Sequence, residues 1–202
     1  MPVLTVRPTR LDERIAREVA EHTDLPAENV AKAVTWGADE HVLLALAAIG
    51  WVLTRRAGTP QRRLGNHILA CSVTTAALPH IMKLFINQER PDRLTIEGHL
   101  RGIPLSGKSE DAFPSGHAMH VGALASAATL LPPKYRNAIW AAGAVLVTIR
   151  IVLLAHWFTD VVAGLALGVG VERGMRILTK PTPVGEEAIP SGLKPHQKLS
   201  PN

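Results

Sequence analysis

The sequence predicts an all-α fold: a multi-pass membrane bundle of about five transmembrane helices, preceded by an amphipathic N-terminal helix. Charged residues are concentrated at the N-terminus, in residues 55–63 and in residues 83–111, whereas residues 118–131 and 137–171 are almost free of charge. Apolar segments also recur along the chain, and basic or polar stretches separate them. A soluble helical bundle, whose core helices can be as long, is the alternative interpretation.

The overall composition is compatible with both alternatives. The 202 residues are enough for one domain, and a hydrophobic fraction of 47% is ordinary for a soluble protein. The net charge of +5 does not predict a nucleic-acid partner, because Lys and Arg are scattered between apolar runs and form no single basic face. Basic cytoplasmic loops of a membrane protein explain the same surplus. Cys71 is the only cysteine, which excludes an internal disulfide and a cysteine-based zinc site.

Residues 1–39 are interpreted as an amphipathic N-terminal helical segment. Leu11, Ile15 and Val19 follow one another at intervals of four, with charged residues between them, and this spacing predicts a helix over residues 10–22. Residues 23–26 contain turn-forming residues that end this helix, and a second helix is expected over residues 27–38. The start of the chain lacks the apolar core of a signal peptide, so membrane insertion is expected to use internal segments.

Residues 40–178 are interpreted as the transmembrane domain, with a disordered tail over 179–202 that is rich in Pro, Gly and charge. Gly164 and Gly168 have the spacing of closely packed helices. Glu172, Arg173 and Arg176 are expected at a solvated helix end. The five apolar segments are residues 42–53, 68–86, 118–131, 138–155 and 161–171.

Polar residues gather in three islands at the ends of these segments: residues 83–91, 113–117 and 148–160. The first island combines Lys83 with Arg90, and a Lys with an Arg suits a phosphate ligand. The second island is a Pro-Ser-Gly-His turn directly before an apolar helix, where backbone N–H groups form an anion site. Taken singly, the first island is better explained by membrane-interface anchors. The second island, taken singly, is also explained by an ordinary helix start capped by Ser115.

The third island contains a histidine and a carboxylate at helical spacing. On one helix, His156 and Asp160 would share a face, and the carboxylate would accept a hydrogen bond from the imidazole. Arg150 lies six residues earlier and joins that face only if the helix breaks between them. A structural hydrogen-bonded pair is the alternative interpretation.

In this order, the three islands resemble the type 2 phosphatidic acid phosphatases and their vanadium haloperoxidase relatives. That family carries Lys-x6-Arg-Pro, then Pro-Ser-Gly-His, then Ser-Arg-x5-His-x3-Asp. Ile149 departs from the pattern, because it occupies the position that is usually Ser or Thr. The resemblance covers about residues 40–178. The matching residues are Lys83, Arg90 and Pro91, then Pro114 to His117, then Arg150, His156 and Asp160.

The resemblance implies a metal-independent phosphatase without a cofactor. His156 would attack phosphorus to form a phosphohistidine, Asp160 would orient it, and His117 would protonate the leaving group and later activate water. The phosphoryl oxygens would be bound by the cations and by the Pro-Ser-Gly-His turn, that is by Lys83, Arg90, Ser115, Gly116 and Arg150.

The expected function is therefore hydrolysis of a lipid phosphate or diphosphate at a multi-pass cell membrane. Undecaprenyl diphosphate, phosphatidylglycerophosphate and phosphatidate are the substrates considered. The loops at 55–63 and 134–136 are short and basic and are expected in the cytoplasm, which assigns the active site to the outer face. A catalytically idle membrane scaffold or transporter-like bundle is the alternative function, and a soluble haloperoxidase is a third.

Overall fold

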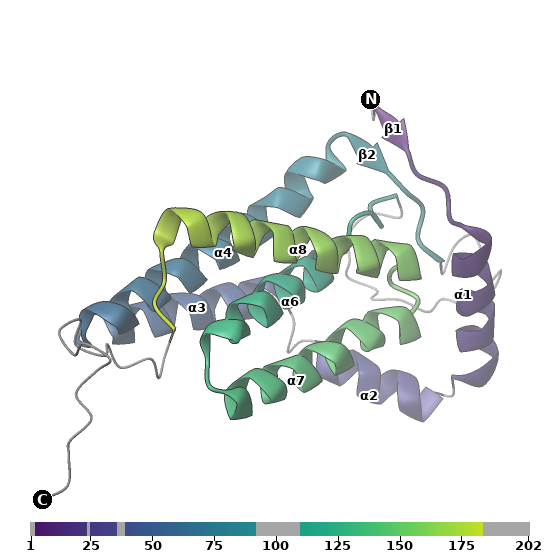
Figure 1. Cartoon of the computed structure of the whole chain (residues 1–202). Coiled ribbons are helices and arrows are strands. Elements are labelled where there is room, and N and C mark those ends of the chain that lie inside the picture. The colour runs from purple at the N-terminus through teal and green to yellow at the C-terminus, as the bar shows by residue number, and fades with distance from the viewer. Residues whose placement is uncertain (1–2, 24, 36–38, 92–109, 184–202) are drawn as a thin grey trace, which may run out of the picture.

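The computed structural model describes residues 3–23, 25–35, 39–91 and 110–183. Its long elements are all helices, as the sequence predicted (Figure 1). The sequence predicts a long loop over residues 87–116, of which residues 92–109 lie outside the described residues. Residues 184–202 of the tail predicted over 179–202 also lie outside them. The helices are α1 (Arg10–His22), α2 (Leu25–Thr35), α3 (Glu40–Thr54), α4 (Thr59–Lys83), α6 (Gly116–Ala127), α7 (Pro133–Val152) and α8 (Phe158–Thr179).

Short elements complete the fold. A 3-10 turn, η2 (Ala128–Leu130), extends α6, and two short strands, β1 (Leu4–Thr5) and β2 (Ile86–Asn87), pair in parallel. The sequence did not predict these strands. Within the described ranges, no helix has both the length and the apolar character needed to cross a membrane.

Helices α6 and α8 form the centre of the bundle and lie side by side in Figure 1. Glycines permit this close approach, because a Cβ at Gly164 would lie 2.5 Å from the Ser115 carbonyl oxygen and one at Gly122 would lie 2.9 Å from Leu165 Cα. The predicted Gly164/Gly168 packing motif is therefore confirmed: both glycines face α6 and are buried. This contact packs the first turn of α6 against the second turn of α8.

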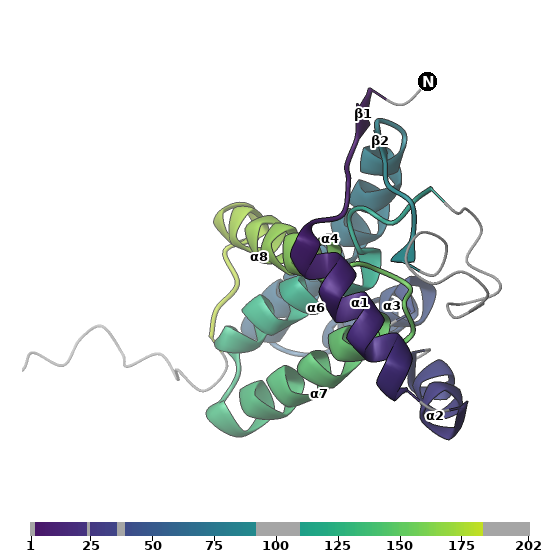
Figure 2. The ribbon, with the colours of Figure 1, turned by 90° about the vertical axis from the view of Figure 1, so that its right-hand side faces the viewer.

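Helix α1 has the predicted bounds, and its buried face matches the predicted one in part: Val19 packs against the core, whereas Leu11 is exposed. It crosses the end of the bundle where α7 ends and α8 begins (Figure 2). Leu11, predicted on the apolar face, is 50% exposed, whereas Asp12 and Ala16 are buried. Ala16 packs against Ala112, Leu154 and Trp157, and this small apolar contact places α1 on the segment between α7 and α8.

The far end of α8 holds a buried polar cluster. Glu172 is fully buried and accepts hydrogen bonds from Ser126 Oγ at 2.6 Å and Arg176 Nε at 2.7 Å, and His67 Nε2 lies 3.0 Å from it. The second nitrogen of His67, Nδ1, lies 2.8 Å from Thr179 Oγ1. The expectation of a solvated helix end at Glu172 is therefore wrong: the carboxylate joins α4, α6 and α8.

Candidate active site

Lys83 and Arg90 meet at one carboxylate. Backbone pairing brings residues 88–90 beside residues 110–112, since Gln88 N donates to the Glu110 carbonyl oxygen and Ala112 N to the Gln88 carbonyl oxygen, both at 3.0 Å. Asp111 then accepts from Arg90 Nη2 at 2.8 Å and lies 3.6 Å from Lys83 Nζ. The shared carboxylate holds the two predicted phosphate ligands at one place.

The Pro-Ser-Gly-His turn forms the start of α6. Ser115 is buried at the N-cap, where its Oγ accepts from Ala118 N at 3.4 Å and its own N–H donates to the Asp160 carbonyl oxygen at 3.3 Å. Both the cap interpretation and the anion-site interpretation fit this position. His117 follows in the first turn of α6.

His156 does not lie on a helix. Helix α7 ends at Val152 and α8 begins at Phe158, and between them Leu154 adopts a left-handed conformation with φ of 50°. His156 Nδ1 lies 2.7 Å from the Ala112 carbonyl oxygen, which can only accept, so Nδ1 carries the proton and Nε2 keeps its lone pair. The backbone, rather than Asp160, therefore sets the tautomer of the ring.

Asp160 lies close to His156 without a direct hydrogen bond between the side chains. Its Oδ2 is 3.8 Å from His156 Nδ1 and accepts instead from Trp157 N at 2.9 Å. The expectation that this carboxylate accepts the ring proton is wrong, because the break before α8 removes the helical register that it assumed. The Asp160 side chain is fully buried.

Arg150 reaches the site because α7 stops two residues after it. Its side chain is 2% exposed, and Nη1 donates to Thr35 Oγ1 at 2.9 Å, at the end of α2. The Arg150 carbonyl oxygen accepts from Ala155 N at 3.1 Å, so the chain turns back immediately. The helix break that Arg150 required is thus present.

Lys83, Arg90 and Arg150 converge on His156. Burial, followed by the charges of Arg90, Arg150 and Lys83 and by His117, holds the pKa of His156 well below its usual range. Arg90 also contacts the residue directly before His156, since its Nη1 donates to the Ala155 carbonyl oxygen at 2.7 Å. A neutral imidazole with a free Nε2, among three cations, is equipped to attack an anionic phosphoryl group.

Sequence reasoning missed three partners in this site: Asp111, Thr35 and the Ala112 carbonyl. Asp111 lies two residues before Phe113, and an acidic residue beside a predicted anion site was the one available signal. Thr35 and the Ala112 carbonyl had no sequence signal, because their partners lie 115 and 44 residues away. All three position the predicted residues.

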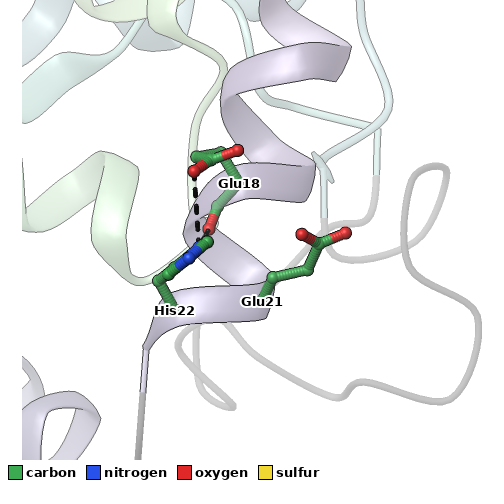
Figure 3. Close-up of side chains that lie close together, drawn as sticks. All are labelled: Glu18, Glu21 and His22. Carbon is green, nitrogen blue, oxygen red and sulfur yellow. Dashed lines mark hydrogen bonds and ion pairs between the residues drawn. The ribbon is translucent and has the colours of Figure 1, made fainter.

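In the described part of the chain, one group of side chains has the spacing of metal ligands. Glu18, Glu21 and His22 lie together near the end of α1, with ligand atoms within 4.8 Å of one another (Figure 3). All three are exposed, and His22 already pairs with Glu18 at 3.5 Å. None of the predicted site residues belongs to this group.

Two curated relatives, both named lipid A 1-phosphatase, match part of the chain. The protein of Rhizobium johnstonii is 38% identical over 106 residues, and that of Rhizobium etli is 37% identical over 106 residues. The match covers 52% of this chain and 43% and 46% of those proteins, so the chain spans less than half the length of the curated relatives it matches.

Two crystal structures share the fold. Aquifex aeolicus LpxE has a TM-score of 0.63 at 16% identity, over 83% of this chain and 95% of that one. The first transmembrane PAP2 type phosphatidylglycerolphosphate phosphatase from Bacillus subtilis has a TM-score of 0.61 at 20% identity, over 84% of each chain. Residues 65–180, more than half of the sequence, match the PAP2 superfamily. The chain therefore belongs to the PAP2 superfamily.

Proposed function

We propose that this protein is a membrane-embedded lipid phosphate phosphatase that works through a phosphohistidine on His156. The observation that carries the proposal is the hydrogen bond from His156 Nδ1 to the Ala112 carbonyl oxygen. It leaves Nε2 deprotonated and nucleophilic in a site whose cations suit a phosphoryl group. The superfamily membership and the names of the two relatives agree with phosphatase chemistry.

In the first step, His156 Nε2 attacks phosphorus while the bond from phosphorus to the leaving oxygen breaks. Lys83, Arg90 and Arg150 offset the charge on the transferring group, and Ser115 with the Gly116 amide binds its oxygens. The attacking ring becomes positively charged. Asp160, whose Oδ2 is 3.8 Å from Nδ1, stabilises that charge.

His117 acts as the general acid and then as the general base. In the first step, its protonated ring donates a proton to the leaving oxygen. In the second step, neutral His117 takes a proton from water as that water attacks the phosphohistidine, which releases phosphate and restores His156.

We further propose a multi-pass membrane arrangement of α3, α4, α6, α7 and α8. Large apolar side chains are exposed on α3, α7 and α8, which favours contact with lipid. The end of the bundle opposite the site is basic, with Arg55 and Arg56 after α3 and Arg62 and Arg63 near the start of α4. This favours a cytoplasmic location for that end. The active site then faces outward. Exposed apolar residues include Leu46, Ile49, Val52 and Leu53 on α3, Val145 on α7 and Val162 on α8.

Labelling of single cysteines tests this orientation. In a Cys71→Ala background, cysteine replaces Glu110 at the site end or Gln61 at the basic end; both positions are exposed. A membrane-impermeant maleimide should label intact cells only at position 110. Labelling at position 61 alone would invert the topology.

A phosphate-release assay on purified protein tests the activity. The panel contains lipid A, favoured by the names of the relatives, with undecaprenyl diphosphate, phosphatidylglycerophosphate and phosphatidate. We expect hydrolysis of at least one of them, unchanged by a chelator and abolished by His156→Ala. His22→Ala, which removes an exposed histidine of α1, is the matched control. Absence of hydrolysis across the panel would favour an idle membrane bundle.

A further inference from the structure

One carboxylate of the N-terminal helix connects two helix starts. Asp12 is 1% exposed, and its Oδ2 accepts hydrogen bonds from Thr9 N and Thr9 Oγ1, both at 2.8 Å, at the start of α1. The same side chain reaches α8. Its Oδ1 accepts from Thr159 N and its Oδ2 from Thr159 Oγ1, both at 2.9 Å. The buried carboxylate is therefore held by donors at the starts of two helices, and Thr159 lies 147 residues from Asp12 along the chain.

Helix α8 needs this external acceptor. An N-cap residue ordinarily accepts from the amide of the second or third helical residue through a side-chain oxygen. The N-cap of α8 is Trp157, whose indole N–H can only donate and does so to the Glu89 carbonyl oxygen at 2.7 Å. Asp12 supplies the missing acceptor at Thr159, the second residue of the helix.

The capped turn carries the catalytic pair. His156 directly precedes the N-cap, and Asp160 is the third residue of α8. Asp160 Oδ2 accepts from Trp157 N, so the two carboxylates satisfy different amides of one helix start. Apolar contacts of Ala16 with Leu154 and Trp157 place α1 on the same segment.

We infer that Asp12 is a positioning residue that caps the catalytic helix in place of its own N-cap and thereby fixes His156. The inference rests on the proposed function for its kinetic consequence. Asp12 lies outside residues 65–180, the part that matches the superfamily. The N-terminal segment would then complete the active site as well as cover the bundle.

Hydrogen–deuterium exchange tests the cap without reference to activity. Asp12→Ala removes every acceptor at this point, whereas Thr9→Ala removes the hydroxyl that caps α1 and leaves the contact with Thr159 intact. Both variants should lower the thermal midpoint. Peptides covering residues 153–161 should exchange at least tenfold faster in Asp12→Ala and within twofold of wild type in Thr9→Ala. Equal exchange of this peptide in the two variants would overturn the cap.

Enzyme kinetics test whether loss of the Asp12 cap displaces His156. A displacement of His156 by about 1 Å is expected to lower kcat by roughly 10² in Asp12→Ala, with KM within twofold, because phosphate binding relies on residues that α1 does not hold. Asp12→Asn keeps one acceptor and should be intermediate. Thr9→Ala should retain kcat within twofold. An unchanged kcat in Asp12→Ala despite faster exchange would overturn the positioning role.

The inference can still be tested if the proposed function fails or if Asp12→Ala does not fold. If wild type hydrolyses no lipid phosphate, the proposed function fails, and exchange of residues 153–161 still decides whether Asp12 holds His156 in place. If Asp12→Ala does not fold, Asp12→Asn is measured instead. An exchange rate in Asp12→Asn equal to that of Thr9→Ala would then refute the inference.

Discussion

The contact between α6 and α8 provides a sharp test of the fold, through Gly168→Ala with Gly170→Ala as its control. Both substitutions add one methyl group within α8. A Cβ at Gly168 would lie 2.8 Å from Ala123 N and closer still to the Met119 carbonyl oxygen, whereas a Cβ at Gly170 would meet no atom within 4 Å. The two variants therefore differ in packing against α6 and share their effect on helix propensity.

The expected energies have opposite signs. Ordinary contact begins at 3.4 Å, so Gly168→Ala must shift α8 away from backbone atoms of α6, which cannot rotate aside. Overpacking of this kind costs about 1–3 kcal/mol, partly offset by a propensity gain of up to about 1 kcal/mol. Gly170→Ala has the gain in helix propensity without the cost of overpacking. A difference of about 2 kcal/mol corresponds to ~4–8 °C in the thermal midpoint for a chain of this size.

Thermal unfolding followed by circular dichroism measures this difference in purified protein. Activity provides a second measurement, because α6 carries His117 and α8 carries Asp160, and Gly168→Ala separates them. We expect Gly168→Ala to be the less stable and the less active of the two. Midpoints that agree within 1 °C would show that the helices do not approach as described and would refute the reasoning.

A further prediction concerns the buried carboxylate of Glu172. Glu172→Ala should cost about 3–5 kcal/mol in thermal unfolding, because it leaves His67 and Arg176 without their carboxylate partner. Arg173→Ala removes an exposed partner of the same carboxylate and should cost below about 1 kcal/mol. Equal losses in the two variants would contradict this.

The sequence predicted the helices well where local signals mark their ends. Thr9 and Asp12 form a capping box at the start of α1, and the predicted range of 10–22 is observed. The break between α7 and α8 had no such signal, because residues 151–155 are apolar and continue the preceding periodicity. Tertiary hydrogen bonds from Arg90 and His156 hold the segment open, and they offset the cost of a left-handed Leu154.

The environment of Glu172 was predictable in principle. Gly164, Gly168 and Glu172 follow at intervals of four, so the face of α8 that packs closely against α6 continues to the carboxylate. Its arginine neighbours indicated a solvated end, but Arg176 turns inward to bind it. The spacing of small residues was therefore a better guide to burial than the local charge.

Helix α8 is thus held at both ends by buried carboxylates, and the two ends have different consequences. Asp12 and Asp160 bind amides of its first turn, next to His156, whereas Glu172 binds side chains of α4 and α6 about three turns away. Loss of Glu172 should weaken the whole bundle and leave the catalytic turn capped. Loss of Asp12 should release that turn while the contact between α6 and α8 persists. Substitution of Glu172 should therefore act mainly on the stability of the bundle, and substitution of Asp12 mainly on turnover.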